Sequence, residues 1–368
     1  MKRSKHHLMK RTARVYLNEL NPGKAVIVQD FVYFCHDIIQ YYVDLFWQRQ
    51  DKSGKLADLP TVHLGKNRFG TTTRLCQALA KQAKEIVRSQ HKREKKRKPR
   101  LRYHTVTLFY HFVTIEKFTK NGFDWAVKLI GSGAPRLTIP TPSTKLINQR
   151  IASGWEMSKT IRMGIRGDGR LWIDFIFEKE RPKLKEEGKI VGMDSNYKNG
   201  LVFSDGQTTG DVIYKRIQEF AFRQKHTKAE VKSMIGAALK QTDFSQIKTI
   251  VVEDLKKVKS GTRGTFSRRF NRRLSHWLYR YSETLIERKC EELGIEVIRK
   301  NPWKTSQFCR YCFKWDRRNR RGDKFLCVNC HHGVEHADFN ASKNLELLGL
   351  LGFYGIHDLQ NSKCQSFE

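Results

Sequence analysis

The chain has 368 residues, in which 71 Lys and Arg side chains oppose 37 Asp and Glu, so its formal net charge is +34 at pH 7. The length allows two or three domains with at least one sizeable hydrophobic core. So large a charge repels itself unless a polyanion shares the surface, which favours a nucleic-acid partner; a merely basic ribosomal or nucleoid component is the alternative.

The sequence contains no segment typical of membrane insertion or secretion. It has no run of about 18 apolar residues, and its longest candidate, residues 347–356, is short and interrupted by glycines. No apolar stretch follows the basic amino terminus, which is therefore unlike a secretory signal. Four of the eight cysteines form two tight pairs, which favours a metal site in a reducing compartment. We expect an intracellular, cytoplasmic protein without a membrane partner.

The first ninety residues predict a short strand and two helices. A strand is expected at residues 13–17, and Asn21-Pro22 is a helix-start signal with Asn as the cap and Pro at the first helical position. Apolar residues at helical spacing then predict one helix over residues 26–47 and a second over residues 73–89.

Residues 91–100 form a basic run, which we interpret as a phosphate-contacting strip or, alternatively, as a solvated linker. Beyond it, four segments rich in β-branched and aromatic residues predict a small antiparallel sheet or barrel. These segments are residues 105–112, 125–130, 136–139 and 171–177. The charged stretch at residues 181–188 then marks a candidate domain boundary.

Three acidic residues follow apolar segments in the second half of the chain. An apolar strand over residues 190–193 ends in Asp194 and turns back as a hairpin, and another strand over residues 249–252 ends in Glu253. Asp338 lies in the first turn of a helix whose apolar face is Ala337, Ala341, Leu345 and Leu348. Acids at two strand ends and one helix start are typical of an RNase H-like fold.

Phosphodiester hydrolysis explains why three such acids are useful together. The reaction must activate a water and stabilise both the attacking and the leaving oxygen, and two divalent cations about 3.5–4 Å apart can do both. Mg²⁺ prefers carboxylate oxygens. The acids therefore predict a magnesium-dependent site.

Two cysteine pairs, Cys309-x-x-Cys312 and Cys327-x-x-Cys330, are separated by 14 residues. Two such pairs at this distance can supply four thiolates to one tetrahedral Zn²⁺ and hold a short hairpin without a core of its own. Cationic residues lie between the pairs and predict a tip suited to phosphate contact.

Five sequence blocks carry a resemblance to a known family. They read VGMDSNYKNG, IVVEDLKKV, FNRRLSHWLYRYSETLIERKCEELGIEVIRKNPWKTSQFCRYC, CVNC and HADFNASKNL. On these blocks residues 189–346 resemble the TnpB proteins of insertion sequences and, more distantly, the compact type V CRISPR effectors. The resemblance implies an RNA-guided DNA endonuclease with a split RuvC-like domain interrupted by a zinc ribbon.

The resemblance also implies the site residues and partners. The catalytic acids would be Asp194, Glu253 and Asp338, holding two Mg²⁺ ions, and the ligands of one structural Zn²⁺ would be Cys309, Cys312, Cys327 and Cys330. A guide RNA and a target double-stranded DNA with a short flanking motif would be the partners. The sequence does not separate TnpB from a compact CRISPR effector.

The expected fold class is multidomain α+β. A wedge-like β-barrel would comprise residues 1–25 and 96–183, and a helical recognition insert residues 26–95. The RNase H-like (RuvC) nuclease would comprise residues 184–306 and 333–350, the zinc ribbon residues 307–332, and a tail residues 351–368.

Two positions depart from the family pattern. Asp194 is followed by Ser195-Asn196-Tyr197, where the family usually has Leu-Gly or similar. The family also tends to place Gly after each cysteine pair, where this chain has Phe313 and His331. Neither departure removes a ligand, so both concern loop shape.

Basic residues form three candidate nucleic-acid contacts. The stretch 256–273 contains eight Lys or Arg, no acid, and two aromatics, a pattern suited to backbone contact and base stacking. The candidates are Lys92, Arg93, Lys95, Lys96, Arg97, Lys256, Lys257, Arg263, Arg268, Arg269, Arg272, Arg273, Arg317, Arg318, Arg320 and Arg321. The helix expected over residues 274–293 is interpreted as core packing.

Two other functions remain open from the sequence. One is a guided DNA-binding regulator that does not cleave, and the other is a DNA transposase or resolvase with the same type of site. The three retained acids argue against the regulator, and the ribbon between the second and third acids argues against an ordinary transposase.

Overall fold

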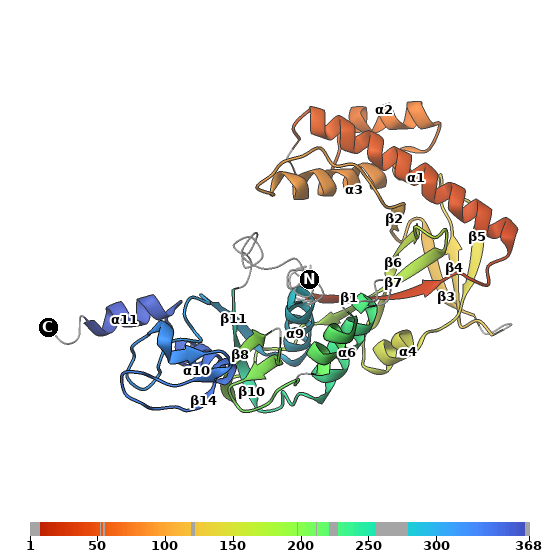
Figure 1. The fold of residues 1–368 in the computed structure, drawn as a ribbon. Coiled ribbons are helices and arrows are strands. Elements are labelled where there is room, and N and C mark those ends of the chain that lie inside the picture. Colours follow the sequence, from red (N-terminus) through yellow and green to blue (C-terminus); the bar gives the residue numbers. More distant parts are fainter. Residues whose placement is uncertain are drawn as a thin grey trace. The chain divides into compact units, whose positions relative to one another are not determined.

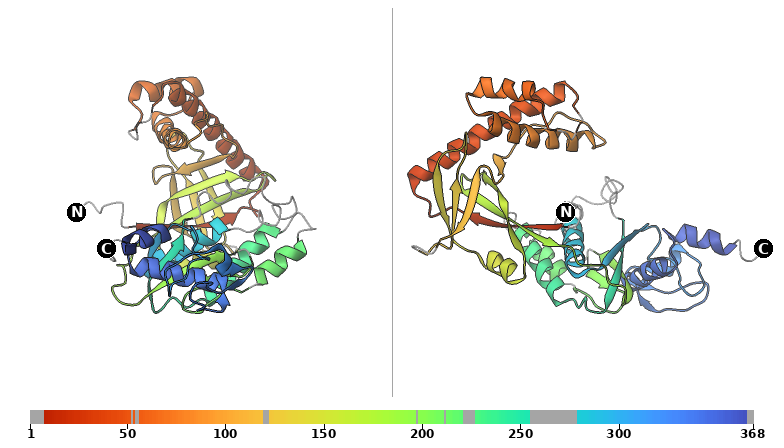
Figure 2. Two further views of the ribbon diagram at one scale, coloured as in Figure 1. Left: turned by 60° about the vertical axis from the view of Figure 1, so that its left-hand side comes forward. Right: turned by 180° about the vertical axis from the view of Figure 1, so that it is seen from behind.

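The computed structural model describes residues 8–51, 53, 56–118, 122–196, 198–210, 212–220, 227–254 and 279–364. The chain divides into two compact units, Met1–Glu180 and Arg181–Glu368 (Figures 1 and 2). Among the described residues, no helix is long and apolar enough to cross a membrane.

Three helices follow the first strand: α1 (Pro22–Gln48), α2 (Leu59–Phe69) and α3 (Thr73–His91). The two predicted helices and the start of the first are confirmed, because the Asn21 side chain accepts a hydrogen bond from the backbone N–H of Gly23. The sequence did not predict α2, because Leu59 and Leu64 are exposed and give no clear apolar periodicity.

Two antiparallel sheets complete the first unit, with strand orders β1-β7-β6-β2 and β3-β4-β5. The strands are β1 (Leu8–Tyr16), β2 (Thr105–Leu108), β3 (Val113–Lys117), β4 (Trp125–Leu129), β5 (Leu137–Thr141), β6 (Glu156–Ile165) and β7 (Leu171–Glu180), and helix α4 (Lys145–Ala152) precedes β6. The predicted antiparallel pairing is confirmed. The sequence missed β6, whose first half is polar and carries an irregularity in register.

A buried carboxylate fixes three strands of the larger sheet. Asp174 on β7 is 2% exposed and accepts hydrogen bonds from Arg14 on β1 at 2.7 and 3.0 Å and from Arg162 on β6 at 2.6 Å. The Arg14 guanidinium also lies 3.7 Å from the ring centre of Trp172. Because a buried charge without its partners is strongly destabilising, these pairs help to fix the order of the strands.

A second four-stranded sheet, with the order β11-β10-β8-β9, forms the centre of the second unit. Strands β8 (Lys189–Asn196), β10 (Ile247–Glu253) and β11 (Glu296–Lys300) are parallel, and β9 (Gly200–Phe203) returns from β8 as the predicted hairpin. Helices α5 (Val212–Phe220), α6 (Thr227–Gln241) and α9 (Tyr279–Leu293) also belong to this unit. The described part of the helix expected over residues 274–293 agrees with α9, and its first residues lie outside the described chain.

Helix α10 (Ala337–Leu350) packs directly on β8. Gly192 allows this close approach, because a Cβ atom there would lie 1.9 Å from the carbonyl oxygen of Ser342. The four residues predicted to form the apolar face of the helix are all buried. The packing brings the start of α10 to the end of β8, where the predicted acids lie.

Short elements connect β11 to the end of the described chain. They are the 3₁₀ helix η1 (Arg317–Asn319), strands β12 (Arg320–Arg321), β13 (Lys324–Phe325) and β14 (Glu335–His336), and helix α11 (Ile356–Cys364). The three strands form a sheet in that order. Its small core is Cys309, Phe325, Cys327 and Ala337.

Candidate active site and metal centre

The structure brings the three predicted acids together at one end of the sheet. Val252 on β10 pairs with Met193 on the parallel strand β8, so the next residues, Glu253 and Asp194, are neighbours at the carboxyl ends of the strands. Asp338 reaches the same place from the first turn of α10. Asp194 and Asp338 are buried, and Glu253 is half-buried.

Burial and mutual repulsion raise the pKa values of two of these carboxyls. Burial, followed by the charges of Glu253 and Asp338, holds the pKa of Asp194 well above its usual range. Burial raises the pKa of Glu253 to about 7; a hydrogen bond from Thr305 opposes the rise, and the charge of Asp338 adds to it. Acids arranged in this way repel one another when ionised, so the site favours a bound cation.

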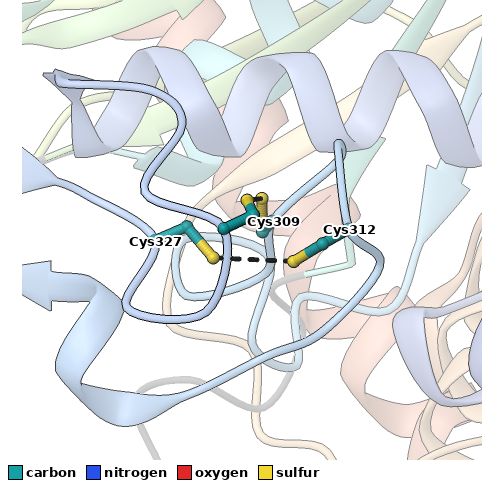
Figure 3. Close-up of side chains that lie close together, drawn as sticks. Cys309, Cys312 and Cys327 are labelled. Atoms are coloured by element: carbon teal, nitrogen blue, oxygen red, sulfur yellow. Dashed lines mark hydrogen bonds between the residues drawn. The ribbon is translucent and has the colours of Figure 1, made fainter.

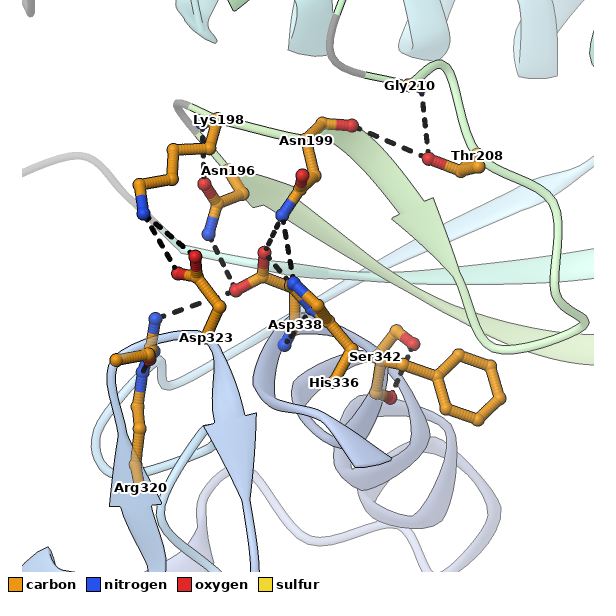
Figure 4. A network of polar contacts seen from close by, with 12 residues as sticks. Asn196, Lys198, Asn199, Thr208, Gly210, Arg320, Asp323, His336, Asp338 and Ser342 are labelled. Carbon is orange, nitrogen blue, oxygen red and sulfur yellow. Dashed lines mark hydrogen bonds and ion pairs between the residues drawn. The ribbon is translucent and has the colours of Figure 1, made fainter. Parts of the chain in front are cut away.

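Side-chain amides from the β8–β9 hairpin hold both oxygens of Asp338 (Figure 4). Asn196 Nδ2 donates to Oδ1 at 2.6 Å, and Asn199 Nδ2 donates to Oδ2 at 2.7 Å. His336 caps the helix, with its Nδ1 accepting from the backbone N–H of Asp338 at 3.2 Å. Asn196, the last residue of β8, belongs to the segment that departs from the family pattern, and here it contacts Asp338.

The strands between the cysteine pairs also reach the acids. On β12, Arg320 Nη2 lies 3.6 Å from Asp338 Oδ1, and the charge of Arg320 lowers the pKa values of Asp194 and Glu253 against the stronger effect of burial. Lys198 of the hairpin forms an ion pair with Asp323 at 2.8 Å (Figure 4). The hairpin and the ribbon thus contact each other beside the acids.

The structure distinguishes Glu253 from its neighbour Asp254. Glu253 Oε1 accepts a hydrogen bond from Thr305 Oγ1 at 2.7 Å and interacts with the other two acids. The charge of Asp254 instead acts on Glu283 of α9, since consecutive side chains of a strand point to opposite faces. The structure therefore places Glu253 among the three acids, and its assignment over Asp254 stays a prediction.

The four predicted cysteines form a second cluster (Figure 3). Their sulfur atoms all lie within 4.8 Å of one another, with Sγ of Cys309 3.6 Å from that of Cys330 and Sγ of Cys312 3.5 Å from that of Cys327. Four sulfurs at zinc–sulfur distances of about 2.3 Å in a tetrahedron would be about 3.8 Å apart. The cluster can therefore hold one tetrahedral metal ion.

The residue after each cysteine pair adopts a left-handed backbone. Phe313 has φ of +58° and His331 has φ of +53°. Glycine adopts this conformation without a steric penalty, which explains why a glycine suits these two positions. The Phe313 and His331 backbone N–H groups donate to the carbonyls of Cys309 and Cys327, so both turns form without glycine.

The predicted nucleic-acid contacts are placed unevenly. Residues 92–97 are all exposed, whereas the candidates in 256–273 lie outside the described residues. In the ribbon, Arg317 and Arg321 are exposed, Arg318 pairs with Asp316 at 2.7 Å, and Arg320 faces the acids.

Sequence reasoning missed the residues that hold the acids. Asn196, Asn199 and Thr305 carry no charge and follow no periodic pattern, so only their nearness to Asp194 and to the first cysteine pair could have marked them. Arg320 was predicted as a nucleic-acid contact but not as a neighbour of Asp338, because that contact needs the ribbon to fold back on α10.

Comparisons with known proteins agree with this picture. Residues 279–345 match the family described as Cas12f1-like, TNB domain, which spans α9, both cysteine pairs and Asp338. The CRISPR-associated endodeoxyribonuclease Cas12f1 of Syntrophomonas palmitatica is 28% identical over 157 residues, which cover 35% of this chain and 29% of that protein. The protein of the same name from Sulfoacidibacillus thermotolerans is 36% identical over 100 residues, covering 27% and 22%.

A solved structure of a Cas12f1–sgRNA–target DNA complex contains a chain similar in fold, with a TM-score of 0.54 at 15% identity, covering 89% of this chain and 83% of that one. The resemblance to TnpB and the compact type V effectors is confirmed. The chain is thus similar in its multidomain α/β fold to the chain in that complex. Its sequence matches span less than a third of the length of either curated relative.

Proposed function

We propose that this chain is an RNA-guided DNA endonuclease with a RuvC-like site. The observation that carries the proposal is the meeting of Asp194, Glu253 and Asp338 at the carboxyl end of a mostly parallel sheet. An antiparallel hairpin followed by parallel strands, with α10 packed on β8, supports an RNase H-like nuclease domain. The names of both relatives describe endodeoxyribonucleases, in agreement with this chemistry.

The three carboxylates would hold two Mg²⁺ ions. Carboxylate oxygens are the ligands that Mg²⁺ prefers. Burial and the charges of neighbouring acids raise the pKa values of Asp194 and Glu253, and a divalent cation would favour their ionised forms. Bound divalent ions would supply an activated water and stabilise charge on the attacking and leaving oxygens.

The residues around the acids have separate tasks in this proposal. Asn196 and Asn199 orient the carboxylate of Asp338, and Thr305 orients that of Glu253. Such neighbours of metal ligands fix their geometry and basicity. Arg320 lies 3.6 Å from Asp338, where its guanidinium can contact the charged oxygens of a scissile phosphate.

The four thiols would hold one structural Zn²⁺, because soft sulfur ligands in a tetrahedral set suit this ion. The zinc ribbon would then be a support for the active site. It carries Arg320 and Asp323, which contact Asp338 and Lys198 of the nuclease domain.

The guide RNA and the target DNA would meet the basic surfaces. The net charge of +34 and the exposed strip at 92–97 support a large phosphate contact. Guide pairing would select the target, and the first unit, as a wedge-like barrel with a helical recognition insert, would hold the guide and read a short flanking motif. The domain bounds expected from the sequence are retained as part of this proposal, with an insertion sequence as the source.

The test is to sequence RNA that co-purifies with the protein and then to assay cleavage of DNA matching its guide segment. We expect one discrete non-coding RNA and Mg²⁺-dependent cleavage that Asp194→Asn abolishes without weakening target binding. Guided binding with no cleavage by the unaltered protein would identify a regulator instead. Strand joining without a guide would identify a transposase.

A further inference from the structure

Two indole rings with a lysine between them form an exposed surface close in sequence to Thr305, which contacts Glu253. Trp303 follows β11, and Trp315 follows the first cysteine pair. Their side chains are 41% and 38% exposed, and the ring centres lie 5.7 Å apart in an edge-to-face arrangement. Large aromatic side chains gain much from burial, so two exposed indoles in contact need a reason.

Lys304 places its ammonium group over both rings, 4.2 Å from the ring centre of Trp303 and also against Trp315. Among the described residues, no carboxylate pairs with it. The backbone of Lys304 is left-handed, with φ of +60°, and its carbonyl accepts from the N–H groups of Gln307 and Phe308. A strained backbone at a non-glycine residue is often retained at a binding or catalytic site.

Both rings lie on segments that adjoin the acids or the cysteine cluster. Thr305, the residue after Lys304, donates the hydrogen bond that holds Glu253. Trp315 forms a β-bridge with Phe308, next to Cys309, so the cysteine cluster fixes this ring. The surface therefore starts one residue from a contact of the active site.

We propose that Trp303, Lys304 and Trp315 form a stacking platform for an unpaired base of single-stranded DNA that enters the active site. The inference rests on the proposed nuclease function and adds a substrate contact to it. An indole face accepts any base, and a lysine without a carboxylate partner suits the adjoining phosphate. Bases inside a duplex are already stacked on each other, so the platform selects a single strand.

Lysine and base would exchange places on the rings. An exposed contact between a cation and a ring is weaker than the stacking of a base on an aromatic face. The flexible stem of Lys304 lets the ammonium group leave the rings and pair with the phosphate. In the absence of DNA, the Lys304 side chain thus covers the two rings, and it leaves them when a single strand binds.

The test compares two labelled strands of equal length and charge: oligothymidylate and an abasic deoxyribose-phosphate oligomer. Binding is measured by fluorescence anisotropy with Asp194→Asn protein, so that no cleavage is required. We expect Trp303→Leu to weaken oligothymidylate binding by about fivefold or more while leaving the abasic strand unchanged, since stacking is worth about 5- to 150-fold per base. Trp303→Phe, which keeps a flat ring, should retain most of the preference.

Lys304→Gln supplies an independent measurement. It should weaken binding of both strands and reduce the slope of log affinity against log salt by about 0.7, the value for one phosphate contact on a single strand. Zinc content, measured by elemental analysis, serves as the folding control for each variant. Equal binding of both strands by wild type and Trp303→Leu would overturn the platform, as would a Trp303→Phe variant as weak as Trp303→Leu.

These outcomes are separate from those that test the nuclease. A protein that cleaves guided DNA but shows no base-dependent loss in Trp303→Leu has the proposed function without the platform. A base-dependent loss in a protein that never cleaves supports the platform and contradicts the nuclease.

Discussion

The carboxylate cluster and the cysteine cluster lie in the same unit but are built in opposite ways. The carboxylates come from two strands and a helix, are held by amide and hydroxyl donors, and repel one another. The cysteines come from two short turns, and Cys309 and Cys327 themselves form the small core together with Phe325 and Ala337. The sheet therefore holds the acids without a metal ion, whereas the ribbon has little besides a metal ion to hold it.

The largest expected effect separates chemistry from folding at the acids. Asp194→Asn should lower guided cleavage by about 10³-fold or more, because several kcal/mol of transition-state stabilisation depend on the metal site. The same variant should melt at a higher temperature than the metal-free wild type, because it removes one of the repelling charges. Single-turnover cleavage and calorimetry measure the two effects.

Asp254→Ala is the matched control for the acids. Asp254 is adjacent in sequence to Glu253, but its charge acts on Glu283 of α9. We therefore expect near wild-type cleavage from Asp254→Ala, whereas Glu253→Ala should be as inactive as Asp194→Asn. Loss of cleavage in Asp254→Ala together with retained cleavage in Glu253→Ala would contradict the assigned site.

Loss of a thiol should impair folding directly, whereas loss of an acid should impair cleavage and leave the fold intact. Cys309→Ser or Cys327→Ser should lose the stoichiometric zinc and unfold the ribbon, because a tetrahedral structural site needs all four ligands. Elemental analysis and limited proteolysis measure zinc content and ribbon folding. Cys290→Ser, at a buried cysteine outside the cluster, is the control and should retain zinc. Wild-type protein without about one zinc per chain would refute the assignment.

A third prediction concerns the hairpin amides. Asn196→Ala and Asn199→Ala should each weaken Mg²⁺ binding and cleavage by about 10- to 100-fold, the usual effect of losing a neighbour of a metal ligand. Asn196→Gln and Asn199→Gln keep the amide but move it, so partial recovery would support orientation of Asp338. Calorimetric titration with Mg²⁺ measures the binding. Unchanged affinity in both alanine variants would mean that Asp338 is positioned by α10 alone.

The two clusters differ in how well the sequence predicted them. The cysteine spacing is local, so its four members could be named from one short segment. The acids could be named because each follows an apolar strand or starts an apolar helix, which are also local signals. The contacts of Asn196, Thr305 and Arg320 could not be predicted, because they depend on how separate elements pack, and packing leaves no periodic signal in the chain.

The same reason explains the uneven prediction of the fold. Helices α1 and α3 bury continuous apolar faces and were predicted, while α2 and β6 have weak or polar patterns and were missed. In the second unit, the parallel order of β8, β10 and β11 needs pairing between distant segments. The sequence predicted β8 and β10 but not β11, and it predicted no order for these strands.

The fourth prediction uses pH to distinguish the clusters. The pKa of Glu253 in the folded chain, about 7, exceeds that of an unfolded Glu, so its contribution to stability is present below about pH 4.5 and is lost as pH rises to about 7. Mg²⁺ must displace this proton, so its affinity should rise by up to about tenfold per pH unit between pH 6 and 7. Titration calorimetry in two buffers should show proton release that Glu253→Gln removes. A flat profile in wild type would mean that Glu253 is already ionised.

The smallest expected effect concerns the left-handed turns of the cysteine cluster. His331 has φ of +53° and an exposed side chain. His331→Gly should therefore relieve backbone strain of order 1 kcal/mol, and the greater entropy of glycine in the unfolded chain should cancel part of this gain in stability. We expect stability to rise by up to about 1 kcal/mol, with zinc retained because His331 is not a ligand.

Phe313→Gly is the matched variant at the other turn. Its φ of +58° is relieved equally, but the Phe313 ring packs with Phe308 at 6.0 Å beside the buried Leu348 and Ile356. Losing a packed aromatic ring costs about 1–3 kcal/mol, which exceeds the relief. The midpoint of thermal unfolding and the resistance of bound zinc to a chelator should therefore rise in His331→Gly and fall in Phe313→Gly. If both glycine variants stabilise the ribbon, backbone strain at the turns affects its stability more than the packing of Phe313 does. If both destabilise it, backbone strain at these turns is negligible.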